Sequence, residues 1–219
     1  MCHLEKYNNR AELLRNWQLS QLFINTDRST RIIEPGQMRM NRLIAVTNKE
    51  DIYPEYQDLP IGLLLEYHNL NHPLDTCSTA QLLVGMCMDN RKHLRIPDNF
   101  AFIIRNAGAN LRYSEFTISY AIAVGGVRSI ALIGHSQCGM VNLVGRREQF
   151  IEGLVDNGGW DKEWAEAHFM HLAPLFEIGN EVDFVLSEAR RLRLRYPRVQ
   201  VAPLMYLVED NRLYMVREE

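Results

Sequence analysis

The stretch ALIGHSQCGMV, residues 131–141, joins the end of an apolar run to a histidine and a cysteine. The β-rich residues 129–133 run into Gly134, and His135 and Cys138 follow just beyond. In an open α/β sheet, the residues that carry chemistry lie at the carboxyl ends of the strands. The stretch therefore predicts a core strand with two candidate metal ligands at its end.

A second stretch, GMCMDNR at residues 85–91, has the same organisation. Cys87 follows the apolar run 81–86, which reads as another buried strand. Asp89 and Arg91 come at alternating positions, so both could face one side of an extended segment. This second strand end therefore adds a thiol, a carboxylate and a guanidinium.

Zinc prefers thiolate sulfur and imidazole nitrogen, and a catalytic zinc keeps three protein ligands and one open position. Cys87, His135 and Cys138 supply three such ligands from the two strand ends. We therefore predict a zinc site. A fourth ligand from Asp89 would give a closed structural site instead, so the sequence leaves both kinds of zinc site open.

The composition is that of an ordinary globular protein. The chain has 219 residues, of which 47% are hydrophobic and 23% charged, and this suits one domain. A net charge of -3 gives no general attraction to nucleic acid or to anionic membranes, so we expect a small-molecule partner bound in a site. No window approaches about eighteen consecutive apolar residues, and the N-terminus lacks the apolar core of a signal peptide. These features predict a cytoplasmic protein.

The cysteines are too few and too irregularly spaced for a disulfide framework in a chain of this length. There are four of them: Cys2, Cys77, Cys87 and Cys138. In a reducing compartment we expect Cys2 and Cys77 to be small apolar side chains. Metal binding is then the expected use of the other two.

The hydrophobic pattern predicts an α/β fold with a mainly parallel central sheet flanked by helices, an N-terminal helical arm and a C-terminal β-hairpin. We expect one domain overall, in which residues 1–79 form the arm and a lead-in segment and residues 80–219 form the zinc-binding core. Helices are expected at 10–25, 61–70, 114–124, 140–156, 161–175 and 181–195, strands at 42–47, 81–88, 100–104 and 128–133, and a hairpin at 199–208 and 212–216.

The two motifs together resemble the β-class carbonic anhydrases. That family pairs a Cys-x-Asp-x-Arg segment with a His-x-x-Cys segment roughly fifty residues on, and here CMDNR precedes HSQC, with His135 48 positions after Cys87. RNAGAN at residues 105–110 is similar to the family's loop after its second core strand. The resemblance covers residues 80–145 specifically and 180–216 in outline.

The resemblance implies a function for each motif residue. Cys87, His135 and Cys138 would bind zinc, and Asp89 and Arg91 would form a catalytic dyad in which Arg91 holds the carboxylate. Asp89 would accept a hydrogen bond from zinc-bound hydroxide and orient it toward carbon dioxide. The implied reaction is the reversible hydration of carbon dioxide to bicarbonate, in a homodimer or higher homo-oligomer.

Two other functions are compatible with the same residues. Relatives of this family hydrolyse carbonyl sulfide or carbon disulfide with the same ligands. In the other reading, Asp89 caps the metal permanently and the protein is a non-catalytic structural or regulatory relative. His93, two positions after Arg91, is a further candidate for proton transfer.

Overall fold

The computed structural model describes residues 39–218. The chain divides into two units, Met1–Glu34 and Pro35–Glu219, and every described residue lies in the second. The helix expected at 10–25 lies outside the described residues. We therefore describe the second unit alone.

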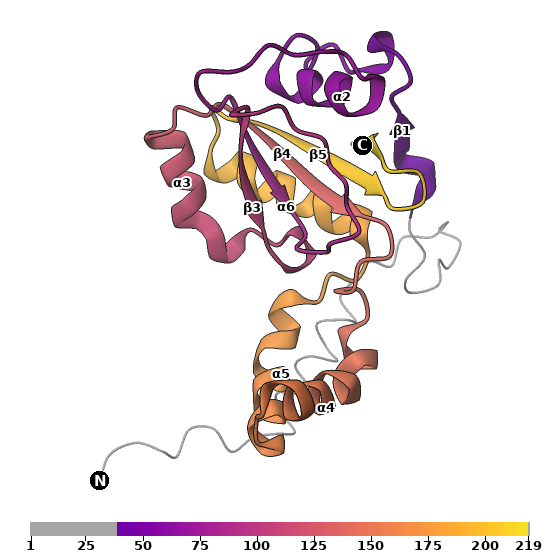
Figure 1. Cartoon of the computed structure of the whole chain (residues 1–219), viewed down its shortest axis with the longest axis vertical. Helices are drawn as coiled ribbons and strands as arrows, with labels where there is room; N and C mark the ends of the chain where they lie inside the picture. The colour runs from indigo at the N-terminus through magenta and orange to yellow at the C-terminus, as the bar shows by residue number, and fades with distance from the viewer. Residues whose placement is uncertain (1–38, 219) are drawn as a thin grey trace. The chain divides into compact units, whose positions relative to one another are not determined.

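Six strands form one sheet in the order β1-β6-β5-β4-β2-β3 (Figure 1). Strand β2 pairs in parallel with β3 and β4, and β4 pairs in parallel with β5. Strands β5 and β6 form the closing antiparallel hairpin, and β1 pairs antiparallel with β6. The strands are β1 Leu43–Ala45, β2 Leu82–Met86, β3 Ala101–Arg105, β4 Ser129–His135, β5 Gln200–Leu207 and β6 Arg212–Val216. The predicted α/β fold with a mainly parallel sheet is confirmed.

Helices cover both faces of the sheet, so the central strands are apolar on both sides. Side chains alternate along a strand. On β2, Leu82 and Val84 pack in the core under α2 (Pro60–Leu70), and Leu83 packs in the core under α3 (Glu115–Ala123) and α6 (Glu181–Arg195). This double burial explains why β2 and β4 read as continuous apolar runs.

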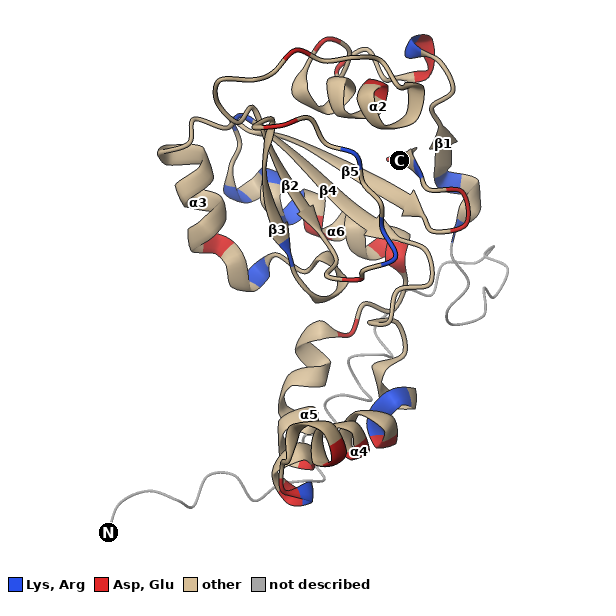
Figure 2. Cartoon of the chain, in the orientation of Figure 1, with Lys and Arg blue, Asp and Glu red and all other residues tan. Residues whose placement is uncertain are grey.

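The helix α6 has the bounds that the sequence predicts. Asn180 caps its first turn by accepting hydrogen bonds from two backbone N–H groups, and acidic residues follow at the positive end of the helix dipole. Arg193 and Arg195 lie in the last turn, at the negative end. Acidic and basic residues are interspersed along the described chain (Figure 2).

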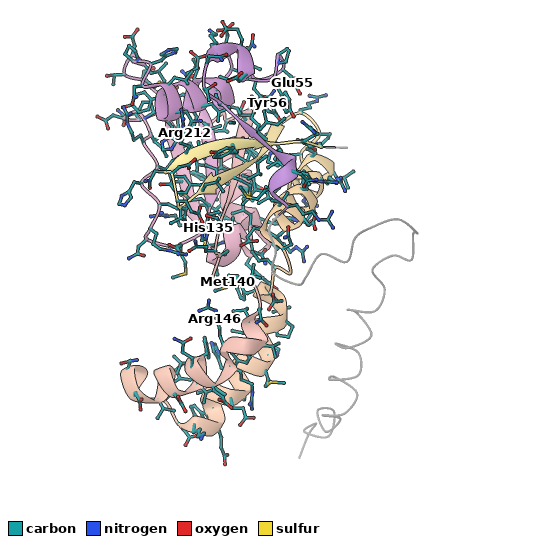
Figure 3. All side chains as sticks on the ribbon, turned by 90° about the vertical axis from the view of Figure 1, so that its right-hand side faces the viewer. Glu55, Tyr56, His135, Met140, Arg146 and Arg212 are labelled. Carbon is teal, nitrogen blue, oxygen red and sulfur yellow. The ribbon has the colours of Figure 1, made fainter. Side chains whose placement is uncertain are left out.

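Several predicted boundaries were wrong. Strand β2 ends at Met86 and strand β1 at Ala45, each two residues before its expected end. Strand β4 runs two residues further than expected, so His135 is its last residue and does not lie beyond it. The helix expected from residue 140 begins only at Arg147, where α4 (Arg147–Gly158) starts. Before it, Asn142 has a left-handed backbone with φ 56°, and a short 3-10 turn, Leu143–Arg146, follows. The chain thus leaves the sheet at His135 and runs past Met140 to Arg146 before α4 begins (Figure 3).

One more helix and several short turns lie in the described residues 39–218. Helix α5, Lys162–Phe176, contacts α4, and Asp161 caps its start. The 3-10 turns are Met40–Arg42, Lys49–Asp51, Ala107–Ala109, Arg112–Ser114 and Leu143–Arg146. Among the described helices, none is long and apolar enough to cross a membrane.

Sheet register brings the two motif stretches together. Met86, the last residue of β2, lies opposite Ile133 of β4, so Cys87 emerges beside Gly134 and His135. A Cβ on Gly134 would lie 2.5 Å from Val185 Cγ2 of α6. The sheet end therefore needs glycine at this position, because α6 packs against the backbone next to His135.

Candidate metal centre

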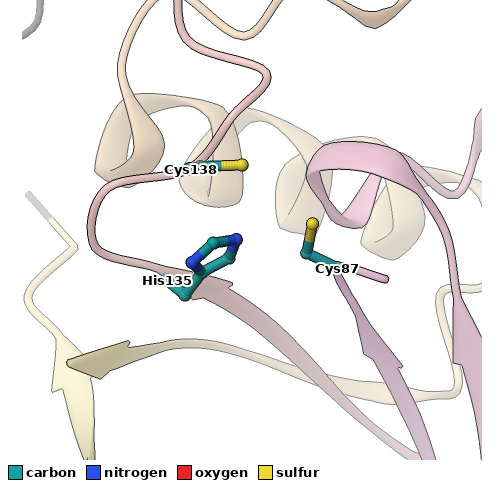
Figure 4. A group of neighbouring side chains, drawn as sticks. All are labelled: Cys87, His135 and Cys138. Atoms are coloured by element: carbon teal, nitrogen blue, oxygen red, sulfur yellow. The ribbon is translucent and has the colours of Figure 1, made fainter. Parts of the chain in front are cut away.

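Cys87, His135 and Cys138 converge at the carboxyl end of the sheet. Their ligand atoms all lie within 4.8 Å of one another, and all three side chains are buried. The two sulfur atoms and the imidazole ring face a common space (Figure 4). Two strand ends and one loop thus assemble the predicted cluster, which has the size and donor set of a metal site.

The hydrogen bond of His135 fixes which nitrogen is available to a metal. His135 Nδ1 lies 2.9 Å from the backbone oxygen of Ser136, and a carbonyl can only accept, so Nδ1 carries the proton. His135 Nε2 is buried and has no hydrogen-bond partner among the described residues. A buried nitrogen of this kind requires a partner, and a metal ion would supply it. The residues therefore fit a metal.

The two cysteine sulfurs interact with each other. Hydrogen bonding to Cys138 lowers the pKa of Cys87, and His135 lowers it further, whereas the contact with Cys87 raises the pKa of Cys138. One sulfur is thus stabilised as a thiolate and the other as the thiol that donates to it. Metal binding requires deprotonated cysteines, so a divalent cation would replace the shared proton.

Asp89 and Arg91 form a tight pair beside this cluster. Arg91 Nε lies 3.1 Å from Asp89 Oδ1, and Arg91 Nη2 lies 2.8 Å from Asp89 Oδ2. The backbone N–H of Arg91 also donates to Oδ1 at 2.9 Å, so the pair meets across a turn and not along the extended segment that we expected. These hydrogen bonds hold the pKa of the Asp89 carboxyl well below its usual range.

The Asp89 carboxylate also lies close to the cluster of Cys87, His135 and Cys138. Its Oδ2 lies 4.0 Å from His135 Nε2. Lys92 Nζ, on a buried side chain, and Arg105 Nη2 bind the backbone oxygen of Asp89 at 2.9 and 3.3 Å. The position of Asp89 is therefore fixed from both its backbone and its side chain.

The RNAGAN segment supports the end of β2. The backbone N–H of Asn106 donates to Met86 O at 3.0 Å, and the N–H of Met88 donates to Asn106 O at 3.2 Å, so these bonds bracket Cys87. Gly108 has a left-handed φ of 65°, and a Cβ there would lie 3.1 Å from Ile178 Cγ2. Ile178 packs on both cysteines, which explains the need for a glycine close to the site.

Part of the chain matches a known protein family. Residues 83–174 match the family model described as carbonic anhydrase. The match confirms the resemblance to that family. No curated protein matches the sequence.

Solved carbonic anhydrases share the fold of this chain at low identity. The enzyme from Streptococcus mutans is 19% identical over 76% of this chain and 100% of its own, with a TM-score of 0.50. Carbonic anhydrase from Glaciozyma antarctica is 20% identical over 76% and 100%, with a TM-score of 0.51. β-Carbonic anhydrase isoform I from Trichomonas vaginalis is 16% identical over 70% and 92%, with a TM-score of 0.52. The second unit thus has a carbonic anhydrase fold.

Several residues that surround the site escaped the sequence analysis. Glu181, at the start of α6, is buried, and its Oε1 accepts a hydrogen bond from the backbone N–H of Cys138 at 3.3 Å. Gln137 and Glu209 form hydrogen bonds that connect Arg91 to the closing hairpin. Gln137 lies inside the HSQC motif, so its position marked it for attention. Glu209 carries no comparable sequence signal, since only the hairpin register brings it to the site.

Proposed function

We propose that this protein is a zinc-dependent carbonic anhydrase that hydrates carbon dioxide reversibly to bicarbonate. The observation that carries the proposal is the buried Cys87, His135 and Cys138 cluster, in which His135 Nε2 has no hydrogen-bond partner among the described residues. Zinc in such a cluster lowers the pKa of the water that it binds to about 7 and so provides a hydroxide nucleophile at neutral pH.

The Asp89 and Arg91 dyad would orient the nucleophile. Because Arg91 donates to both carboxylate oxygens, Asp89 stays ionised and can only accept a hydrogen bond. Asp89 Oδ2, at 4.0 Å from His135 Nε2, is close enough to the cluster to accept that bond from the attacking oxygen. The acceptor thereby directs a lone pair of the nucleophile toward the carbon of carbon dioxide.

The capped, non-catalytic arrangement would require a different geometry. To bind the metal, Asp89 Oδ2 would have to exchange its 2.8 Å hydrogen bond to Arg91 Nη2 for a metal bond. A charge-assisted, two-point contact of this kind is among the stronger hydrogen-bonding arrangements in proteins. The observed pairing therefore favours an open fourth position, which a catalytic zinc needs.

We also propose that the chain acts as a homodimer or higher homo-oligomer. Strand β3 is one of the two edges of the sheet, and its Phe102 and Ile103 are 40% and 51% exposed. Phe116 of α3 is 84% exposed. An unpaired edge strand with apolar side chains is a ready surface for pairing with another chain. Replacing Ile103 by Glu should lower the mass measured by ultracentrifugation, and an unchanged mass would count against this surface.

The expected location is the cytoplasm, which we retain as a proposal. Among the described residues, Cys77, Cys87 and Cys138 form no disulfide. Free thiols persist in a reducing compartment.

Zinc analysis of matched cysteine variants tests the metal assignment. We expect about one zinc per chain in the wild type, because a catalytic site of this kind holds one ion. Zinc should be lost from Cys138→Ala and retained in Cys77→Ala, since Cys77 lies outside the cluster. Undiminished zinc in Cys138→Ala would exclude this site.

A substrate panel tests the reaction. Zinc-loaded protein assayed with carbon dioxide, carbonyl sulfide and carbon disulfide should turn over carbon dioxide fastest. Faster hydrolysis of a sulfur-containing substrate would replace the proposed activity with that of the hydrolase relatives. A zinc-loaded protein that is inert toward all three would support the regulatory reading.

A further inference from the structure

Gln137, which lies between His135 and Cys138, has an unusual backbone conformation. Gln137 has a left-handed backbone with φ 56°, which is energetically unfavourable for a residue with a side chain. Its side chain is exposed, so burial of apolar surface does not offset this cost. The compensation must come from the hydrogen bonds that the conformation permits.

Gln137 binds a second edge of the Arg91 guanidinium, and Nη2 donates to both Gln137 and Asp89. Arg91 Nη1 donates to Gln137 Oε1 at 3.1 Å, and Arg91 Nη2 donates to the Gln137 backbone oxygen at 2.9 Å. The guanidinium therefore lies between two acceptors, Asp89 and Gln137. Because the Arg91 side chain is 41% exposed, water competes for each of these contacts. Losing Gln137 would leave Asp89 to hold the guanidinium against that competition.

Glu209 in turn holds Gln137. Gln137 Nε2 donates to Glu209 Oε1 at 2.8 Å, and Ser136 Oγ donates to Glu209 Oε2 at 2.7 Å. Ser136 Oγ itself accepts from the backbone N–H of Val208 at 2.9 Å. The carboxylate in the hairpin turn thus braces both loop residues that separate the metal ligands.

An amide is the side chain that this arrangement requires. Gln137 accepts from Arg91 with its oxygen and donates to Glu209 with its nitrogen at the same time. A carboxylate could accept but not donate, and an ammonium could donate but not accept. The donor and acceptor pattern therefore runs in one direction, from Arg91 through Gln137 to Glu209.

We propose that Gln137 is a positioning residue that keeps Arg91 on Asp89, and that Glu209 anchors it from the closing hairpin. The inference rests on the proposed function, because the dyad matters only if it orients the nucleophile. It assigns to the residue between Ser136 and the second cysteine ligand a function beyond spacing the two ligands. It also makes the C-terminal hairpin a part of the site.

The test compares the solvent exchange of the Arg91 Nε–H group, followed by nitrogen-15 NMR, in matched variants. Gln137→Asn keeps the amide and tolerates the left-handed backbone, but it is one methylene too short. We expect faster Arg91 Nε–H exchange and a fall in carbon dioxide hydration, each about three- to tenfold, with zinc content unchanged. The control Gln57→Asn, whose amide binds Ile52 O, should change neither.

A reversal of the hydrogen bond provides the rescue. Gln137→Glu places a carboxylate against Glu209. Repulsion between the two carboxylates should move the side chain at position 137 away from Glu209 and disturb its contact with Arg91. The double variant Gln137→Glu with Glu209→Gln restores each bond, because Gln at 209 can donate to Glu at 137 and still accept from Ser136. Exchange at Arg91 should then return toward the wild-type rate.

Unchanged Arg91 exchange in Gln137→Asn, or a double variant no slower in exchange than Gln137→Glu, would overturn the positioning role. The NMR signal does not depend on turnover. Wild-type protein without carbon dioxide hydration but with the predicted exchange pattern would therefore refute the proposed function and leave the positioning role supported.

Discussion

Arg91 binds Asp89 through both carboxylate oxygens, with Nε 3.1 Å from Oδ1 and Nη2 2.8 Å from Oδ2. The same Oδ2 lies 4.0 Å from His135 Nε2, the nitrogen that is available to a metal. Asp89 Oδ2 thus binds the arginine and also lies next to the group formed by Cys87, His135 and Cys138. The chemistry that we propose depends on this oxygen keeping its hydrogen bond to the arginine.

Arg91→Lys should lower carbon dioxide hydration while zinc stays bound. A lysine ammonium is a point charge and cannot hold both oxygens in the planar geometry of a guanidinium, so Asp89 loses its orientation. We expect kcat to fall about tenfold or more, which corresponds to a loss of about 1.4 kcal/mol of transition-state stabilisation. Stopped-flow assays with zinc analysis of the same samples measure both quantities.

Arg95→Lys is the matched control for that variant. Arg95 lies in the same loop, but it contacts Asn71 and the ring of Tyr67 and not the dyad. The carbon dioxide hydration activity of Arg95→Lys should stay within about twofold of the wild type. Equal losses in both variants would show that the loop tolerates no change, and would remove the support for a specific dyad.

Gly134→Ala should destabilise the fold next to the candidate metal site. The added Cβ would lie 2.5 Å from Val185 Cγ2 and 2.8 Å from Met205 Sδ, so β4 and α6 must move apart. Overpacking of this kind costs about 1 to 3 kcal/mol in the free energy of unfolding. Urea denaturation measures the change.

Gly153→Ala serves as the comparison. Gly153 lies within α4, and a Cβ there meets no atom closer than 3.8 Å. Alanine is the better helix former, so this variant should be stabilised by about 0.5 to 1 kcal/mol. A Gly134→Ala protein as stable as the wild type would contradict the close packing of α6 against β4.

The free energy of unfolding should decrease as the pH is lowered, because of His68. Its Nε2 lies 3.0 Å from the Asn211 backbone oxygen and its Nδ1 accepts from the Arg95 N–H at 3.1 Å, so the folded protein holds the neutral ring. Burial lowers the pKa of His68 below its usual value. Below about pH 6.5 the His68 ring therefore binds a proton more readily in the unfolded chain than in the folded protein. The free energy of unfolding decreases from that pH down to the lower pKa that His68 has in the folded protein.

His68→Gln removes this titration. Between about pH 7.5 and 5.5 the free energy of unfolding of the wild type should decline more steeply than that of the variant, by at most about 1.4 kcal/mol per pH unit. Urea denaturation at three pH values measures both slopes. Parallel slopes would show that His68 is not held in its neutral form.

The sequence predicts most of the fold because its local signals agree with its tertiary contacts. Helix α6 is found at its true bounds because Asn180 caps it, Arg195 lies in its last turn and Pro197 follows. Strands β2 and β4 are found because helices bury both of their faces. The three candidate metal ligands are predicted because they lie at or just beyond the ends of these strands.

The wrong helix start and the site residues that the sequence did not predict are explained by tertiary contacts. Residues 140–146 look helical, but the Glu177 carboxylate accepts from the backbone N–H groups of Asn142 and Leu143 at 2.9 and 2.5 Å and holds a turn there. In the same segment, Met140 packs against the cluster that contains the two cysteines. Contacts that join residues 35 positions apart leave no mark on local periodicity, and the same holds for Glu209 and Gln137.

Stopped-flow carbon dioxide hydration by Asp89→Asn, compared with the wild type at equal zinc content, tests the central claim most directly. Asparagine keeps the shape of the side chain but removes its charge. It also replaces one acceptor oxygen by an NH2 donor, so it cannot accept from both Arg91 and the nucleophile as the carboxylate does. We predict that wild-type protein hydrates carbon dioxide at about pH 8, above the pKa of zinc-bound water, and that Asp89→Asn loses at least about tenfold in kcat with zinc unchanged. A fully zinc-loaded wild type without hydration activity, or an Asp89→Asn protein as active as the wild type, would contradict the proposed mechanism.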